Sequence, residues 1–221
     1  MKNYKVSVLI ANYNNQIFID ECIHSIKNQT YKNIEIIFHD DCSKDNSLKE
    51  IKKFKEVKVI KNKKRSKFGA FNQIKAYQRA FNISSGDIIL FLDSDDFFHK
   101  SKVKNIVKEF SKNNGLLSTF DLPIIKSDNK IFFKSNKKKI LKSFWPYIPP
   151  QSCISIKRNY FKKILKEIDF RLYPNIWMDF RIALYLKFVS KKFFILNKNL
   201  TFYRQTPQMI SSKFTFLSIS W

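Results

Sequence analysis

The segment from Ile88 to Asp96 constrains the fold of this chain more than any other. Five apolar residues, Ile88 to Leu92, run directly into the acidic sequence Asp93-Ser94-Asp95-Asp96. An unbroken apolar run of this length is typical of a strand buried on both faces of a parallel sheet. Ligands of open α/β sheets gather at the carboxyl ends of such strands, which is where these carboxylates are expected. The segment therefore predicts a central strand that ends at a ligand site.

The three neighbouring carboxylates also predict what the site holds. Close carboxylates repel one another and raise one another's pKa unless a cation or several hydrogen-bond donors compensate. Oxygen ligands on a short loop suit Mg²⁺ or Mn²⁺, and Mg²⁺ is usually held by one or two carboxylates together with substrate phosphates. A solvated acidic turn that begins the next helix is the alternative. We favour the metal site because the acidic residues follow a buried strand directly.

Strand and helix patterns alternate through the first 110 residues. Apolar runs predict strands at residues 6–11, 34–38 and 57–60, and apolar stripes predict helices near residues 19–26, 48–54, 70–81 and 103–110. This alternation is typical of a mostly parallel, open α/β sheet with helices on both faces. Right-handed crossovers would bring the loops after the strands, which begin at Asn12, Asp40 and Asp93, to one edge of the sheet.

The second half of the chain is less regular. We predict strands near residues 116–122, 130–133, 151–156, 193–196 and 200–204, and helices near 161–168 and from Trp177 onward. No internal repeat is visible. The chain stops at Trp221 among aromatic residues without a polar tail, which is compatible with a C-terminus cut short.

The charge of the chain is strongly positive. Lys and Arg number 42 against 18 Asp and Glu, a formal net charge of +24, which favours polyanionic partners such as nucleic acid, anionic lipid or phosphorylated substrates. The chain is also rich in Lys, Asn, Ile and Phe, as a compositionally biased genome would produce, so the charge discriminates weakly between them.

The cysteines and histidines exclude two kinds of site. Cys22, Cys42 and Cys153 form no CxxC pair, and the three histidines form no HxxxH pattern, so neither a disulfide framework nor a zinc site is expected. No window is apolar for long enough to span a membrane. These features predict a cytoplasmic protein whose Lys-rich surface could rest on the anionic inner face of a membrane.

Four ordered motifs resemble those of one known family, the inverting GT-A-type glycosyltransferases of family 2. The motifs are the opening strand with Ala11-Asn12-Tyr13-Asn14, the segment Asn28-Gln29-Thr30-Tyr31 with its following strand, the loop Asp40-Asp41-Cys42-Ser43-Lys44-Asp45, and the DxD segment Asp93-Ser94-Asp95-Asp96. Four motifs in order are far more specific than one. The resemblance implies a GT-A fold in a single domain, residues 1–221. Residues 1–110 would bind the nucleotide sugar, and residues 111–221 would bind the acceptor.

The resemblance also implies roles for individual residues of the donor site. It makes Asp95 the principal ligand of Mg²⁺ or Mn²⁺, which would stabilise the leaving nucleoside diphosphate. Lys67, or Arg65 on the same loop, would pair with phosphate oxygens, or would belong to a solvated basic loop. The other implied contacts to the nucleotide sugar are Ala11 through its backbone, Tyr13 by stacking on the base, Asp40 as an acceptor for the base, Asp93 at the ribose or metal shell, and Ser94.

On the acceptor side the resemblance is looser. Asp179, in Trp177-Met178-Asp179-Phe180, stands where the family places its general base, and a helix-capping role is the alternative. Trp145, Gln151 and Ser152 are candidate acceptor contacts, and core packing explains them nearly as well. Arg204 would contact phosphate or form a buried ion pair. Three residues depart from the pattern, because Cys42 replaces a Gly, Ala11 replaces a common Pro and Thr206 stands where many relatives have a His.

The leading interpretation is a metal-dependent inverting glycosyltransferase. It would move a sugar from a nucleotide diphosphate, with UDP the expected carrier, to a surface polysaccharide, lipopolysaccharide or glycolipid acceptor. A basic nucleic-acid-binding module is an alternative, but scattered charge and an acidic loop argue against it, so nucleic acid is not an expected partner. A nucleotidyltransferase lacks support because no glycine-rich loop follows the first strand. A non-catalytic relative that binds a partner is the remaining alternative.

Overall fold

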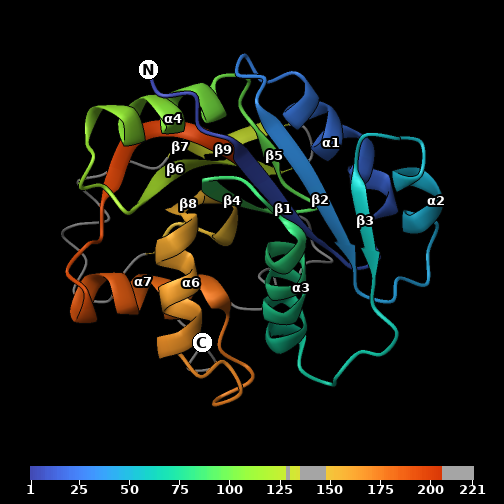
Figure 1. The fold of residues 1–221 in the computed structure, drawn as a ribbon. Coiled ribbons are helices and arrows are strands. Elements are labelled where there is room, and N and C mark those ends of the chain that lie inside the picture. Colours follow the sequence, from blue (N-terminus) through green and yellow to red (C-terminus); the bar gives the residue numbers. More distant parts are fainter. Residues whose placement is uncertain (128–129, 135–147, 206–221) are drawn as a thin grey trace.

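A computed structural model describes residues 1–127, 130–134 and 148–205. Within these ranges the strands form one nine-stranded sheet in the order β3-β2-β1-β4-β8-β6-β9-β5, and β7 pairs with β6. Helices cover both faces of this sheet, with α1 and α4 on one face and α3, α6 and α7 on the other (Figure 1). The predicted α/β fold with helices on both faces is confirmed.

The first half of the chain builds the parallel part of the sheet. Strands β1 (Val6–Asn12), β2 (Ile34–Asp40), β3 (Lys58–Lys61) and β4 (Ile88–Asp93) pair in parallel. The connections carry the helices η1 (Gln16–Phe18), α1 (Ile19–Lys27), α2 (Ser47–Ile51) and α3 (Gly69–Ile83). The alternation read from the sequence is therefore confirmed for these four strands.

Two apolar cores lie against the two faces of the sheet. Side chains alternate between the faces along a strand, so Val8 and Ile10 pack on the face of α1, α2 and α4, while Leu9 packs on the face of α3, α6 and α7. In β4, Leu90 joins the first core and Phe91 the second. Burial on both faces explains why β4 is apolar without interruption from Ile88 to Leu92 and why β1 is largely apolar.

The second half extends the sheet with mixed pairing. Its elements are β5 (Phe97–Phe98), α4 (Lys102–Lys112), β6 (Ser118–Ser127), β7 (Lys130–Lys134), η2 (Gln151–Cys153), β8 (Ile154–Lys157), α6 (Arg158–Glu167), α7 (Met178–Leu184), the π-helix η3 (Tyr185–Val189) and β9 (Ile195–Arg204). β8 is antiparallel to β4 and β6, whereas β9 is parallel to β6 and antiparallel to β5.

Two predicted strands differ in the structure. The strand expected over residues 151–156 begins only at Ile154, because Gln151–Cys153 form a 3₁₀ turn that starts at Pro150, with Cys153 N 2.8 Å from the Pro150 oxygen. The strands expected at 193–196 and 200–204 are one continuous strand, β9, which follows β6 through two register shifts.

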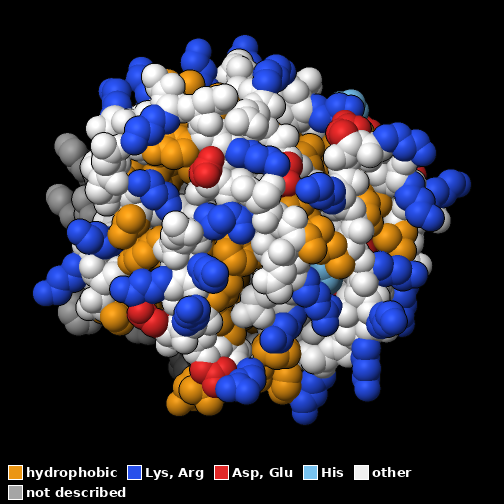
Figure 2. Space-filling view, viewed as in Figure 1, with side chains coloured by type: hydrophobic (Ala, Val, Ile, Leu, Met, Phe, Trp, Pro, Cys, Tyr) orange, Lys and Arg blue, Asp and Glu red, His pale blue; other side chains and the backbone are white. Residues whose placement is uncertain are grey.

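The charged surface shows no single basic stripe on the visible face. Lys and Arg side chains are spread over this face, with few acidic side chains between them (Figure 2). Among the helices of the described ranges, none combines the length and hydropathy needed to cross a bilayer.

Candidate active site

The ends of three parallel strands meet at one edge of the sheet, as the sequence predicts. Asn12 at the end of β1 is in register with Asp40 at the end of β2, and Ala11 is in register with Asp93 at the end of β4. Backbone bonds tie the following loops together, since Ser94 N donates to the Ala11 oxygen at 3.1 Å and Asp41 N donates to the Asn12 oxygen at 2.9 Å. The polar loops therefore converge.

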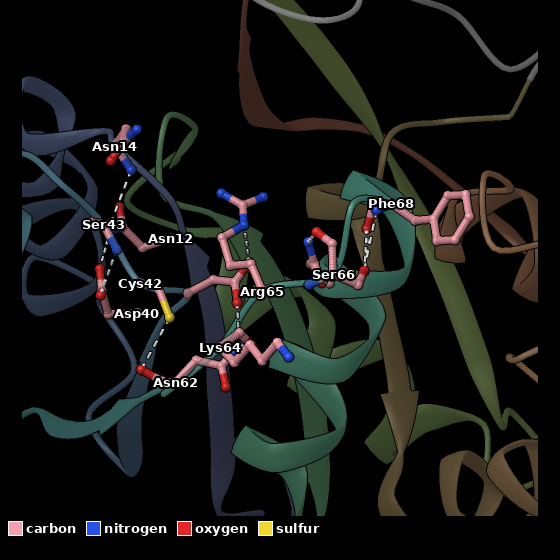
Figure 3. A network of polar contacts seen from close by, with 12 residues as sticks. Asn12, Asn14, Asp40, Cys42, Ser43, Asn62, Lys64, Arg65, Ser66 and Phe68 are labelled. Atoms are coloured by element: carbon pink, nitrogen blue, oxygen red, sulfur yellow. Dashed lines mark hydrogen bonds and ion pairs between the residues drawn. The ribbon is translucent and has the colours of Figure 1, made fainter.

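A polar network surrounds the buried carboxylate of Asp40 (Figure 3). Asp40 Oδ1 accepts from Asn12 Nδ2 at 2.9 Å, and Oδ2 accepts from the backbone N of Ser43 at 3.0 Å. Asn14 N donates to Ser43 Oγ at 3.0 Å. Asn12 Oδ1 is buried and has no hydrogen-bond partner within the described residues. An unpaired buried acceptor is costly, so a ligand that donates a hydrogen bond here would gain from it.

Cys42 lies on the turn beside this network. Its φ is 59°, in the left-handed region that favours glycine. The expectation that a cysteine in place of glycine restricts the backbone here is consistent with this geometry. The thiol Sγ donates to the Asn62 oxygen at 3.2 Å, which links the turn to the loop after β3 (Figure 3).

Arg65 covers the half-exposed ring of Tyr13. Its guanidinium carbon lies 3.1 Å from the centre of the ring, and its Nε lies 2.9 Å from Asp41 Oδ2. Lys67, on the same loop, is exposed, and its ammonium lies 5.1 Å from the centre of the Phe68 ring. Of the two basic residues proposed for this loop, the structure thus places Arg65 beside the strand ends.

The acidic loop, Asp93–Asp96, holds its three carboxylates in different ways. Asp93 Oδ1 accepts from both Tyr77 Oη and Gln73 Nε2 of α3, each at 2.8 Å. Asp96 is buried, and its two oxygens accept from Ser152 Oγ at 2.5 Å and from Arg204 N at 2.9 Å.

Asp95 differs from its two neighbours. In residues 1–127, 130–134 and 148–205, no other residue donates a hydrogen bond to its carboxylate oxygens. Asp95 is therefore the member of the acidic loop whose side chain is free to bind a ligand.

Burial raises the pKa of every carboxyl group in this loop. The pKa of Asp93 rises to about 7, first because of burial and then because of the charge of Asp95. The pKa of Asp96 lies well above its ordinary value for the same reasons, and burial also raises the pKa of Asp95, against the lowering effect of the Arg204 charge. Such a loop stabilises an added cation, because a cation removes the repulsion between the carboxylates.

Arg204 joins β9 to the acidic loop. Its Nε donates to the Asp95 backbone oxygen at 2.8 Å, and its guanidinium carbon lies 4.5 Å from the centre of the Phe18 ring. The guanidinium also pairs with Glu21 of α1, which Lys126 contacts at 3.2 Å. Of the two roles considered for Arg204, the structure shows the ion pair. A phosphate contact stays a prediction.

Asp179 lies in the first turn of α7. Its Oδ1 accepts from the Phe180 backbone N at 2.7 Å, and burial raises its pKa to about 6, against the lowering effect of the Phe180 and Gln151 backbone groups. The Asp179 charge is a lesser cause of the raised pKa of Asp93, so the two carboxylates interact electrostatically. The N-cap of α7 is Trp177, and Asp179 lies in the first turn.

The acceptor contacts proposed from the sequence are placed in part. Gln151 is 2% exposed, and neither its Nε2 nor its Oε1 has a partner within the described residues. Ser152 is fully buried and bonds to the acidic loop, which leaves an acceptor contact as a prediction. Trp145 and Thr206 lie outside the described residues.

The comparison with known families decides the assignment. Residues 7–169 match the model of Glycosyl transferase family 2. The chain belongs to this family. The resemblance read from the four sequence motifs is confirmed.

Curated relatives agree with this family assignment. A glycosyltransferase of Nostoc sp. is 28% identical over 218 residues, which cover 90% of this chain and 64% of that protein. The Escherichia coli UDP-Glc:alpha-D-GlcNAc-diphosphoundecaprenol beta-1,3-glucosyltransferase WfaP is 41% identical over 100 residues, which cover 45% of this chain and 39% of WfaP. The chain thus spans less than two thirds of the length of either relative.

Solved structures show that the family fold is present. Residues 1–349 of S. aureus TarS in complex with UDP align with a TM-score of 0.69 at 21% identity, covering 92% of this chain and 61% of TarS 1–349. The mannosyltransferase PcManGT of Pyrobaculum calidifontis, solved with GDP-Man and Mn²⁺, aligns with a TM-score of 0.62 at 15% identity over 90% of this chain and 56% of that chain. The GT-A architecture predicted for the chain is therefore confirmed.

The family commonly uses a divalent metal, and the acidic loop fits one. No group of three or more His, Cys, Asp and Glu side chains among the described residues is arranged as a metal site. A site built by the protein alone is not needed, because Mg²⁺ is usually held by one or two carboxylates together with substrate phosphates. The free Asp95 carboxylate, with Asp93 beside it, is the smaller set of ligands that would hold such a metal.

Two residues beside the family 2 acidic loop were not identified from the sequence. Gln73 and Tyr77 are four residues apart on α3 and both donate to Asp93. Both lie in the helix predicted near residues 70–81, whose apolar stripe indicates core packing and not a contact with the acidic loop. Their spacing, one helical turn, is the signal that could have placed both side chains on the face toward the strand ends.

Proposed function

We propose that this chain is the catalytic part of a metal-dependent inverting glycosyltransferase that uses a UDP-sugar. The observation that carries the proposal is the free Asp95 carboxylate at the strand edge where the Asp40 network also lies, in a loop whose Asp93 interacts electrostatically with Asp179. The names of two similar proteins, a UDP-glucose-dependent WfaP and a TarS bound to UDP, support UDP as the nucleotide.

In this proposal three residues bind the base: Tyr13 by stacking, Ala11 through its backbone, and Asp40 through its side chain. Base stacking on Tyr13 requires a free ring face, so the nucleotide either uses the face opposite Arg65 or displaces the guanidinium. Asp93 and Ser94 face the ribose and the sugar, and Arg65 or Lys67 and Arg204 contact phosphate. Asp95 would hold Mg²⁺ or Mn²⁺, which lowers the energy of the negative charge on the departing diphosphate.

Asp179 acts as the general base. The acceptor hydroxyl oxygen bonds to the anomeric carbon as the bond from that carbon to the diphosphate oxygen breaks, which inverts the configuration. The hydroxyl proton passes to the Asp179 carboxylate, and UDP leaves with the bonding electron pair. With a pKa of about 6, Asp179 is ionised at neutral pH yet basic enough to take the proton.

The acceptor would be a lipid-linked sugar of a surface polysaccharide, lipopolysaccharide or glycolipid. The name of WfaP, which includes a diphosphoundecaprenol acceptor, supports this class. The proposed acceptor contacts are Ser152, Trp145 and Gln151. The side-chain amide of Gln151 is buried and has no partner among the described residues. A net charge of +24 would favour contact with an anionic membrane at the cytoplasmic face, where such an acceptor is held.

Calorimetric titration of the purified chain tests the donor site. UDP, GDP and a short DNA duplex are each titrated with Mn²⁺ and again with a chelator. We expect micromolar binding of UDP that the chelator abolishes. Binding of DNA alone, with an affinity that falls steeply with salt, would instead support a nucleic-acid-binding function.

Asp95→Asn tests the metal assignment. We expect the affinity for UDP in Mn²⁺ to fall at least tenfold, because the amide removes the negative charge that binds the metal, while UDP binding in chelator stays undetectable, as in the wild type. Asp20→Asn on α1 is the matched control, since Asp20 is exposed and, among the described residues, pairs with His24 alone. Equal affinities of Asp95→Asn and the wild type in Mn²⁺ would refute the assignment.

A further inference from the structure

Lys102, the first residue of α4, is completely buried. Its ammonium nitrogen lies 2.8 Å from Asp121 Oδ1, 2.6 Å from the Ser152 backbone oxygen and 2.6 Å from Thr201 Oγ1. It also lies 4.1 Å from the centre of the Phe98 ring. All three donors of the ammonium group are therefore used, and their acceptors come from β6, η2 and β9.

The Asp121 carboxylate that pairs with Lys102 also has all its oxygens hydrogen-bonded. Thr201 Oγ1 donates to Asp121 Oδ2 at 2.7 Å, so both oxygens of the buried Asp121 carboxylate are bonded. Burying two charges is costly, and apolar residues of similar volume often stabilise a fold as well or better. Stability alone therefore gives no reason for a charged pair at this point in the core.

Ser152 connects this buried pair to the acidic loop. Lys102 holds its backbone oxygen, while its side-chain Oγ accepts from Asp93 N at 3.1 Å and donates to Asp96 Oδ2 at 2.5 Å. The position of Ser152 thus sets the position of both the first and the last carboxylate residue of the loop. Asp95, between them, makes no such bond in the described part of the chain.

We propose that Lys102 is a positioning residue that acts through Ser152. It fixes the backbone of Ser152 so that the serine hydroxyl holds Asp93 and Asp96, which leaves the Asp95 carboxylate directed to the ligand. The inference rests on the proposed function for its effect on metal and nucleotide binding. Its structural part, the link from Lys102 to the acidic loop, does not depend on that function.

Ser152→Ala tests the link directly. The substitution removes the hydroxyl but keeps the backbone oxygen that Lys102 holds. Because Asp93 N and Asp96 Oδ2 lose this partner, the melting temperature should fall by a few degrees with the fold retained. We expect faster hydrogen–deuterium exchange in the peptide covering residues 88–98 and an affinity for UDP in Mn²⁺ lower by about tenfold, the usual effect of losing one hydrogen bond to a charged group. Ser155→Ala is the matched control, because Ser155 is equally buried three residues away and its hydroxyl is unbonded in the described structure.

The double variant Lys102→Met with Asp121→Asn tests the role of Lys102. It removes both charges together, so no uncompensated charge stays in the core. We expect the fold to be retained, while exchange in residues 88–98 rises and the affinity for UDP in Mn²⁺ falls as in Ser152→Ala. Affinity and exchange both equal to the wild type in the double variant would show that Lys102 only packs the core.

Hydrogen–deuterium exchange tests the inference about Lys102, whereas UDP binding also depends on the proposed function. Unchanged exchange of residues 88–98 in Ser152→Ala overturns the inference, whatever the nucleotide data show. Faster exchange in Ser152→Ala, without any effect in Ser155→Ala, supports the link even if the wild type binds no UDP, and that second result would count against the proposed function alone.

Discussion

At the scale of single residues, the same side chain acquires a different role from its surroundings. Asp93, Asp95 and Asp96 are near one another in sequence and chemically alike, yet within the described residues only the Asp95 carboxylate has no hydrogen-bond donor from another residue. The Asp93 carboxylate accepts hydrogen bonds from Tyr77 and Gln73. The Asp96 carboxylate accepts hydrogen bonds from Ser152 and Arg204. The metal ligand predicted from the DxD motif is therefore also the residue that the local contacts leave free.

Asp179→Asn should stop transfer and leave donor binding unchanged. An amide cannot take a proton from the acceptor hydroxyl, so we expect a loss of at least a hundredfold in kcat with the same affinity for UDP in Mn²⁺. In the wild type, kcat/KM should rise with pH through about 6, since the base acts when ionised. Transfer by Asp179→Asn at a rate near that of the wild type would place the base elsewhere.

Asp179→Asn, which should reduce activity, should increase the stability of the protein above about pH 6. Folding raises the Asp179 pKa from 3.8 to about 6, so the native state binds more protons than the unfolded state between these values. Stability from this group is therefore lost as pH rises from about 4 to about 6. Asp179→Asn should be more stable than the wild type at pH 8 by about 1 to 2 kcal/mol, allowing for partial exposure, and equal to it near pH 3. Urea denaturation at the two pH values checks this.

Cys42 offers a second residue-scale prediction, because its backbone is left-handed. Cys42→Gly relieves that conformation but adds freedom to the unfolded chain and loses the contact with Asn62, so its stability should change by less than about 1 kcal/mol. Cys42→Val places a β-branched residue where such residues are rarely found and should destabilise the protein by about 1 to 2 kcal/mol. Urea denaturation of Cys42→Gly and Cys42→Val tests this prediction. Equal stability of the two variants would contradict it.

At the scale of elements, hydrophobic periodicity predicted most of the fold. The four parallel strands and the helices α1, α3 and α4 follow from local patterns, because each strand contains a run of apolar residues and each helix has one apolar stripe. The 3₁₀ turn at Gln151–Cys153 did not follow, because its conformation depends on bonds from Ser152 to the acidic loop nearly sixty residues away, and periodicity does not report such contacts.

The local sequence pattern also did not predict that Lys102 is buried. A lysine at the start of an amphipathic helix is normally solvated, and only the fold brings Asp121 and Thr201 to it. The site shows the same division. Asp40, Asp93 and Asp95 were predicted from motifs, whereas Gln73, Tyr77 and Lys102 act on the acidic loop through contacts between distant segments.

At the scale of the whole molecule, the two halves share both cores. Leu196 and Leu200 from β9 join the core of α1 and α4, and Phe161 and Met178 join the core of α3. The two halves therefore pack around common cores, while the division into a donor half and an acceptor half stays a prediction. This sharing also explains how β9 and η2, from the second half, come to hold a loop that belongs to the first.

The net charge of +24 leads to a prediction for the whole molecule. Like charges on a compact protein repel one another, and salt screens this repulsion over about 10 Å at 0.1 M. The ion pairs that salt would also weaken are mostly exposed, such as Lys53–Glu50 and Arg171–Asp169, and such pairs contribute little. Screening of the repulsion should therefore dominate.

We expect the melting temperature to rise by a few degrees when NaCl is increased from about 20 mM to about 300 mM at pH 7.5, as measured by differential scanning fluorimetry. Sucrose at equal osmolality controls for solvent effects that do not depend on charge, because it screens no electrostatic interaction. A fall in melting temperature with NaCl would mean that ion pairs, including the Arg204–Glu21 pair beside the acidic loop, contribute more to stability than the repulsion removes.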